Sequence, residues 1–340
     1  MKIPSNALAC RTLFLQAATD RRGPVLFGDN GERACEAILP FLEGVPFPEI
    51  YLEFPLAGDS FLDVTILYGE IKPGTRFDSP SAAGTEEVID WFAKARAECS
   101  DISFGYELDT RGNASPGSAA VHFQPRTHNE LVMPFCRALG REDAGRLYTD
   151  LASRMPEGWP LSFFGLFRGR PDSPLRVCGY MDYPEKQRCS EDSSRLEIVF
   201  RTLGFRAYDS LMLSRISAAL AVSPAAVDFQ FDILPDGTLG STFAIDIGFR
   251  TEQSEAIRSS FLDGPFAKVM NLFESWGIAD SRWKLVSDIS LTRSIPVEDE
   301  EGRTHPFGLV IQPHWIKIRW IDGVLRNAKM YCLAHAGLAD

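Results

Sequence analysis

Several signatures that would assign a protein to a familiar class are missing from this sequence. No run of about 18 apolar residues occurs, so neither a transmembrane helix nor a membrane partner is expected. There is no Walker loop and no GxGxxG motif, which excludes the usual nucleotide-binding sites. Ser162 is not part of a GxSxG elbow, so a serine nucleophile of that type is excluded as well.

Positive charge and ordered cysteine spacing are also lacking. The net charge of −11 argues against nonspecific nucleic-acid binding and against a polybasic membrane-surface role. The 7 cysteines are scattered, and neither they nor His314 and His335 have metal-ligand spacing, so no disulfide framework and no metal site are expected. We therefore expect a cytoplasmic protein with reduced thiols. Residues 1–23 are expected to form a helix, because Arg11 interrupts the apolar stretch that a signal peptide requires.

The sequence does contain a repeated order of helical and strand-like segments. Its 340 residues are 45% hydrophobic, which is enough for a large core. Alternating strands come in pairs joined by turn-forming residues, and amphipathic helices separate the pairs. The expected strand pairs are 49–56 with 61–68, 102–108 with 118–124, 161–167 with 175–181, 226–233 with 241–249, and the two halves of 314–335. The expected helices include 32–42, 85–97, 130–139, 144–155, 195–203, 210–221 and 255–276, and a further strand at 283–292 is followed by an acidic loop at 296–306.

This repetition predicts one closed structure. About ten hairpin-linked strands can close into an antiparallel barrel, and closure removes exposed strand edges. Helices would cover the outside, and a barrel of this size can enclose a small-molecule chamber. We therefore predict an α/β-repeat (α+β) fold, in which one domain spanning residues 1–340 forms a ten-stranded antiparallel β-barrel surrounded by helices.

The final strand pair concentrates positive charge on one surface. An Asp-Gly turn divides residues 314–335 and is a strong hairpin signal. Because side chains alternate between the two faces of a strand, the pair can present on a common surface Lys317, Arg319, Lys329 and Tyr331. Arg176 and Tyr180 share a face of the earlier strand 175–181 in the same way. Cations beside phenols within an acidic protein predict an anion site.

Three short motifs accompany this arrangement. Residues 328–331 read AKMY and follow the strand that begins WIKIRW, residues 105–125 contain GYELDTRG and AAVHFQP, and residues 48–54 read PEIYLEF. With the repeated helix–strand–strand–helix order, these motifs resemble the ABBA prenyltransferases, which include fungal indole and cyanobactin-type peptide prenyltransferases. The resemblance implies the PT-barrel fold and a role in natural-product (RiPP) biosynthesis. It also implies transfer of a C5 or C10 prenyl group from an isoprenyl diphosphate to an aromatic or other nucleophilic acceptor, either a small molecule or a peptide.

The resemblance also implies a role for each candidate residue. The diphosphate would be held by four cations, namely Arg176, Lys317, Arg319 and Lys329. Tyr180 and Tyr331 would shield the allylic cation, because aromatic faces attract positive charge. Glu53 would act as the catalytic base, with Asp63 as the alternative. No tightly bound cofactor is expected, Mg²⁺ is expected only together with the diphosphate, and the absence of DDxxD-type clusters argues against an all-helical isoprenoid synthase.

Two other interpretations of the sequence remain open. Ala120 and His122 stand where a Lys-x-Tyr pair would lie, and the smaller number of cations favours a non-catalytic barrel that binds a peptide or small molecule in a natural-product pathway. A third interpretation has two separate α+β domains without a common chamber. The orientation of Glu53 and Lys329 discriminates among them, because the enzyme interpretation requires both side chains to face the same side of a sheet.

Overall fold

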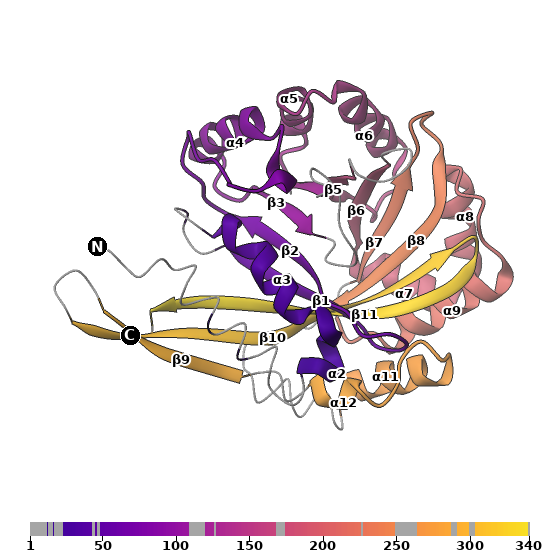
Figure 1. The fold of residues 1–340 in the computed structure, drawn as a ribbon. Helices are drawn as coiled ribbons and strands as arrows, with labels where there is room; N and C mark the ends of the chain where they lie inside the picture. The colour runs from indigo at the N-terminus through magenta and orange to yellow at the C-terminus, as the bar shows by residue number, and fades with distance from the viewer. Residues whose placement is uncertain are drawn as a thin grey trace.

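The β-strands form one antiparallel sheet that closes on itself (Figure 1). The computed structural model describes residues 12, 16, 23–42, 45, 48–108, 120–125, 127–167, 174–225, 227–248, 264–286, 291–298 and 303–338. The strands are β1 (Glu49–Pro55), β2 (Asp63–Tyr68), β3 (Ser103–Leu108), β4 (Ala120–Gln124), β5 (Leu161–Leu166), β6 (Leu175–Met181), β7 (Val227–Ile233), β8 (Leu239–Gly248), β9 (Leu291–Glu298), β10 (Thr304–Ile321) and β11 (Val324–Leu338). Their order in the sheet is β11-β1-β2-β3-β4-β5-β6-β7-β8-β10-β9, and β10 also pairs with β11. This last pairing closes a ring of ten strands and leaves β9 outside it.

The predicted ten-stranded antiparallel barrel is therefore confirmed. The predicted strand pairs all appear as neighbours in the ring, joined in chain order from β1 to β8. Because every described strand belongs to the same sheet, the interpretation as two separate α+β domains is wrong.

Helices surround the barrel on the outside (Figure 1). They are α2 (Gly23–Phe27), α3 (Gly31–Ile38), α4 (Glu86–Glu98), α5 (Val132–Ala138), α6 (Glu142–Arg154), α7 (Tyr183–Glu191), α8 (Ser193–Leu203), α9 (Ser210–Val222), α11 (Pro265–Ser275) and α12 (Trp283–Val286). Short side chains set where several of them begin. The Asp182 carboxylate accepts a hydrogen bond from the Glu185 backbone N–H at 2.8 Å, and Asp209 caps Met212 in the same way at 2.7 Å.

The main hydrophobic core lies between the barrel wall and the helices. Strand β10 shows the pattern: Ile316, Ile318 and Trp320 are fully buried on the outward face and belong to this core. Burying one such aliphatic side chain contributes about 1.5–3 kcal/mol. The alternate residues Lys317 and Arg319 point into the barrel, where they line a cavity. The outward-facing residues of each strand (its outward phase) therefore pack against the helices. The inward-facing residues (its inward phase) line the chamber.

The last two strands are longer than predicted and extend beyond the barrel as an arm (Figure 1). The second half of β10 pairs with β8, from Trp315 onwards, whereas its first half pairs with β9. The register of β10 with β11 shifts between Pro313 and Trp315, so His314 lies in a bulge at the boundary. Proline has no N–H to donate, and bulges accommodate such a residue. The predicted hairpin at 314–335 is thus only the barrel part of a longer one.

The segment before the arm differs from the prediction. The expected strand 283–292 begins instead as helix α12, in which Trp283 and Val286 are buried one helical turn apart. Strand β9 starts only at residue 291 and continues into the expected loop 296–306, of which residues 304–306 already belong to β10. A run of four residues is too short for its hydrophobic spacing to separate a helix from a strand.

Some predicted features lie wholly or partly outside the described residues. These are most of the N-terminal helix at 1–23 and the first part of the helix 255–276, whose described part α11 begins at Pro265. Proline is well suited to the first turn of a helix because it has no N–H to leave unsatisfied there.

Candidate active site

Inward-facing residues of neighbouring strands meet in register across the barrel wall. Asp228 on β7 lies directly opposite Asp246 on β8, Asp246 opposite Lys317 on β10, and Lys317 opposite Lys329 on β11. We call these four residues the polar ladder. Like charges directly opposite one another destabilise a sheet, and the ladder contains two such pairs side by side. An arrangement that costs stability in this way is typical of a ligand site.

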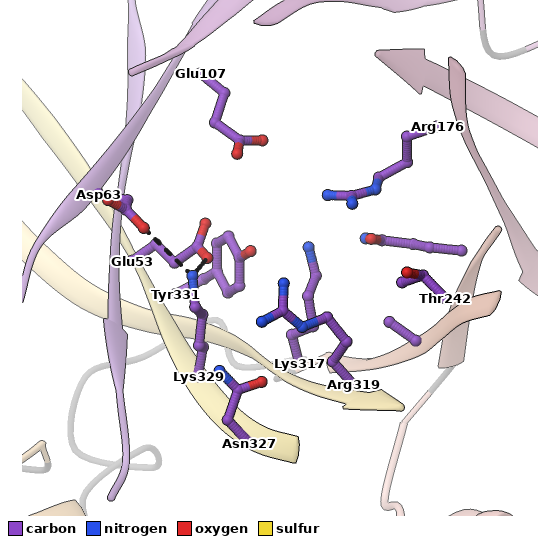
Figure 2. A pocket seen from close by; sticks show the side chains of 12 residues that line it. Glu53, Asp63, Glu107, Arg176, Thr242, Lys317, Arg319, Asn327, Lys329 and Tyr331 are labelled. Carbon is purple, nitrogen blue, oxygen red and sulfur yellow. Dashed lines mark hydrogen bonds and ion pairs between the residues drawn. The ribbon is translucent and has the colours of Figure 1, made fainter. Parts of the chain in front are cut away.

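A cationic cavity occupies one part of the chamber (Figure 2). All four cations predicted to bind the diphosphate line it, namely Arg176, Lys317, Arg319 and Lys329. Glu53, Asp63 and Tyr331 also line this cavity. The structure therefore brings together six of the seven predicted site residues, because they share the inward phase of four strands.

Lys329 lies between two carboxylates at the wall of the cationic cavity (Figure 2). Its ammonium group donates hydrogen bonds to Glu53 Oε1 and to Asp63 Oδ2, the latter at 3.3 Å. All three residues are buried. Burial alone would raise the pKa of Glu53, but the positive charges of Lys329 and Lys317 lower it below the usual value. Glu53 and Lys329 thus face the same side of the sheet, as the enzyme interpretation requires, and Glu53 is held as a carboxylate.

Lys317 and Arg176 differ in how closely a carboxylate balances their positive charge. Lys317 Nζ lies 3.9 Å from Asp246 Oδ2 and 4.7 Å from the centre of the Tyr331 ring. The guanidinium of Arg176 donates to Asp232 at 2.9 Å and lies 4.5 Å from the Phe167 ring. Arg176 already has a close carboxylate partner, so Lys317 is the better placed of the two to receive an anion.

An aromatic cavity adjoins the cationic one. Tyr51, Trp315 and Tyr331 form one wall, with ring centres 5.0 Å apart for Tyr51 and Trp315 and 5.6 Å apart for Trp315 and Tyr331. Tyr331 and Lys317 line both cavities, so these are two parts of one chamber. Burial and the nearby Glu53 carboxylate raise the pKa of Tyr331 well above its usual range, which keeps the phenol neutral.

The predicted cation shield Tyr180 is placed differently from Tyr331. It has the inward phase of β6 and faces Asp228 in register, but it is 45% exposed and lines neither of these two cavities. Strand alternation predicts which face a residue occupies but not its depth in the barrel. The role of Tyr180 as a cation shield stays a prediction, and its exposed position does not support that role.

Sequence reasoning missed the acidic residues of the aromatic cavity. Asp228 and Asp246 both line it, and the alternation of residues 227–233 and 239–248 would have placed both of them inward. Although Asp228 is exposed at the edge of the aromatic cavity, desolvation by the surrounding protein and the facing Asp246 carboxylate raise its pKa to about 7. Burial raises the pKa of Asp246 to about 6, although Lys317 and Gln230 act in the opposite direction. His122, which hydrogen bonds to Glu107 at 3.2 Å, is a further polar residue of this wall.

Comparison with known proteins shows the fold. No family model matches the sequence, and no curated protein matches it either. Among solved structures, the chain is similar to NotF prenyltransferase, with 10% identity, a TM-score of 0.52, and coverage of 96% of this chain and 92% of that one. It is also similar to a 6-dimethylallyl tryptophan synthase, with 12% identity, a TM-score of 0.51, and coverage of 96% of this chain and 95% of that one. For AnaPT from Neosartorya fischeri the identity is 9% and the TM-score 0.50, with coverage of 97% of this chain and 91% of that one. The resemblance to ABBA prenyltransferases is therefore confirmed at the level of the PT-barrel fold.

The described residues offer neither a metal-ligand cluster nor a membrane-spanning helix. Within the described ranges, no three or more His, Cys, Asp or Glu side chains are grouped so that they could hold a metal ion. None of the helices in the described part of the chain has the length and apolarity needed to span a bilayer.

Proposed function

We propose that this protein is a prenyltransferase that moves a prenyl group from an isoprenyl diphosphate to an aromatic acceptor. The observation that carries the proposal is the junction of the two cavities: Lys317 and Tyr331 line both, so a cationic compartment and an aromatic compartment meet inside one closed barrel. The donor's diphosphate would occupy the first compartment, and its prenyl chain would reach the second. The fold shared with known prenyltransferases supports this assignment.

The cations would stabilise the leaving group. Lys317, Arg319 and Lys329 would bind the diphosphate oxygens, and Lys329 would exchange part of its bonding with Glu53 for the phosphate. When the C–O bond of the donor breaks, its electron pair stays on the diphosphate, and positive charge develops on the prenyl carbon. Preorganised cations in a site shielded from water stabilise such a leaving anion by several kcal/mol.

The aromatic wall would then guide the prenyl cation to the acceptor. Tyr331 and Trp315 line the chamber, and the faces of aromatic rings attract a nearby cation. The acceptor ring attacks the cation, a C–C bond forms, and the proton at that carbon is lost. Glu53 is ionised and opposite Tyr331 in register, so it is the proposed base. We propose a C5 or C10 donor and a small aromatic molecule or an aromatic side chain of a peptide as acceptor.

The test is a product assay. The protein is incubated with dimethylallyl or geranyl diphosphate and a panel of free and peptide-borne aromatic acceptors, with and without Mg²⁺, and products are detected by mass spectrometry. We expect a mass gain of one prenyl group, coupled to diphosphate release, and its loss in Glu53→Gln and Lys317→Met. Donor binding without any product would favour the non-catalytic barrel. If the donor does not bind and no product forms, the proposal is overturned.

A further inference from the structure

We propose that Asp228 and Asp246 form a binding site for an ammonium group of the acceptor. The favoured acceptors would then be aromatic amines that carry a positive charge. This inference deepens the proposed prenyl transfer and rests on it for the position of the donor. It concerns the pair of facing carboxylates on β7 and β8, which the proposed transfer step does not use.

Asp246 has an unmet hydrogen-bonding capacity. It is only 7% exposed and lines the aromatic cavity. Its Oδ2 accepts a hydrogen bond from Gln230 Nε2 at 2.5 Å, whereas no described group donates to its Oδ1. A buried carboxylate oxygen without a donor costs stability. A ligand donor within the aromatic cavity would remove that cost.

The charged groups around Asp228 and Asp246 favour the binding of a cation. On the neighbouring strands, Tyr180 faces Asp228 and Lys317 faces Asp246, while Gln230 is the polar neighbour on β7 itself. More distant charges that act on Asp246 are Glu53 and Arg176. The ammonium group of Lys317 lies 3.9 Å from Asp246 Oδ2 and also lines the cationic cavity. A bound diphosphate would therefore compete with Asp246 for this ammonium group. The pKa values of both carboxyls are raised, which indicates that their negative charges are incompletely compensated.

The position of the pair suits an acceptor with a ring and an amine. Both carboxylates share the aromatic cavity with Trp315 and Tyr51, the rings that would hold an aromatic acceptor. Asp228 is exposed, as is the facing Tyr180, so this side of the cavity is accessible from outside. An ammonium group can donate up to three hydrogen bonds and can therefore bridge two facing carboxylates. Two carboxylates can instead share a proton, and the test separates the two cases.

The experiment compares three indoles that differ in charge. Tryptamine is cationic, 3-ethylindole is neutral and indole-3-propionate is anionic. Their affinities are measured by calorimetry at pH 7.5 in the presence of dimethylallyl thiolodiphosphate, on the wild type, on Asp246→Asn and on Asp228→Asn. Asp150→Asn, an exposed position on the outer helix α6, is the matched control.

We expect tryptamine to bind about tenfold or more tightly than 3-ethylindole, with indole-3-propionate the weakest, because hydrogen bonds to charged groups are the strong ones. Asp246→Asn should reduce the preference to near unity while 3-ethylindole still binds, and Asp150→Asn should leave it unchanged. Equal affinities in the wild type, or a preference that survives in both variants of the pair, would overturn the inference. If the two carboxylates share a proton instead, the wild type should show no preference for the amine, which is the first of these outcomes.

This design separates the inference from the proposed function. Donor binding is measured first, with dimethylallyl thiolodiphosphate alone, and its absence would count against prenyl transfer. Acceptor affinity is measured directly rather than through turnover, so the amine preference is decided even if no product forms. Retained binding of 3-ethylindole in each variant shows that the chamber is still folded.

Discussion

The hairpins β10–β11 and β7–β8 have the same construction and opposite charge. Their outward residues are apolar and buried, and Ile318 of one lies opposite Ile245 of the other. Their inward residues at the polar ladder are Lys317 and Lys329 in the first and Asp228 and Asp246 in the second. The comparison shows that the outward phase holds the barrel to its helices, whereas the inward phase is free to carry different chemistry.

The two hairpins also differ in how their charges are compensated. Lys329 has two carboxylates within hydrogen-bonding distance, whereas the closest cation to Asp246 is 3.9 Å away. The cationic hairpin therefore carries a nearly balanced buried network, and the acidic hairpin carries unbalanced charge. The following variants test this difference.

Lys329→Met is expected to have the largest effect on stability. It leaves the buried carboxylates of Glu53 and Asp63 without their cation, and breaking a buried ion pair by removing one partner costs about 3–5 kcal/mol. We expect a decrease of that size in the free energy of unfolding in urea at pH 7. The double variant Glu53→Gln with Lys329→Met should recover part of it, and a loss below about 1 kcal/mol, typical of exposed pairs, would contradict the buried network.

Lys317→Met is expected to weaken donor binding with less effect on folding. Hydrogen bonds to charged groups contribute about 1.5–3 kcal/mol, which corresponds to roughly 10- to 100-fold in affinity. The affinity for dimethylallyl thiolodiphosphate is measured by calorimetry. Lys284→Met, which removes an exposed cation from helix α12, is the control. Equal behaviour of the two variants would show that the diphosphate does not use the cationic cavity.

Asp246→Asn is expected to change how stability depends on pH. The pKa of Asp246 is about 6 in the folded protein and 3.8 ordinarily, so the folded state binds more protons between these values and stability falls as the pH rises through them. Without this carboxyl, stability at pH 8 relative to pH 4 should improve by on the order of 2 kcal/mol. Unfolding followed in urea at both pH values measures it. A difference that is independent of pH would show that Asp246 is already fully compensated.

Ile318→Val and Ile245→Val are expected to have the smallest effects and to match one another. Both side chains are fully buried on the outward face, and removing one methylene there costs about 0.5–1.5 kcal/mol. Urea unfolding should show similar losses, and donor affinity should not change. A strong effect of either variant on binding would mean that the outward phase is not separate from the site.

Much of the fold and of the cationic cavity could be predicted from strand alternation. A period of two residues identified the paired strands and placed Lys317, Arg319 and Lys329 on one surface, because one face of each strand is needed for the core. The arm could not be predicted in this way, because β10 alternates equally before and after the bulge at His314. The depth of a residue in the barrel could not be predicted either. Tyr180 and Arg176 lie on the same face of β6, but Tyr180 is exposed whereas Arg176 lines both cavities.

The compensation of charges was equally beyond the sequence. Arg176 and its partner Asp232 are 56 residues apart, and Glu53 and Lys329 are 276 apart, so only closure of the barrel brings them together. The acidic pair was missed for a different reason. The alternation of β7 and β8 places both carboxylates on the inward face, but the resemblance implies cations, not carboxylates, in the chamber.

The most direct test of the account is calorimetric titration of the unmodified protein with dimethylallyl and geranyl thiolodiphosphate, with and without Mg²⁺. We predict one binding site of micromolar affinity for at least one of the two analogues, because the cationic cavity offers Lys317, Arg319 and Lys329 to a diphosphate next to an aromatic wall. No binding of either analogue under either condition would contradict the prenyl-donor site and with it the proposed transfer.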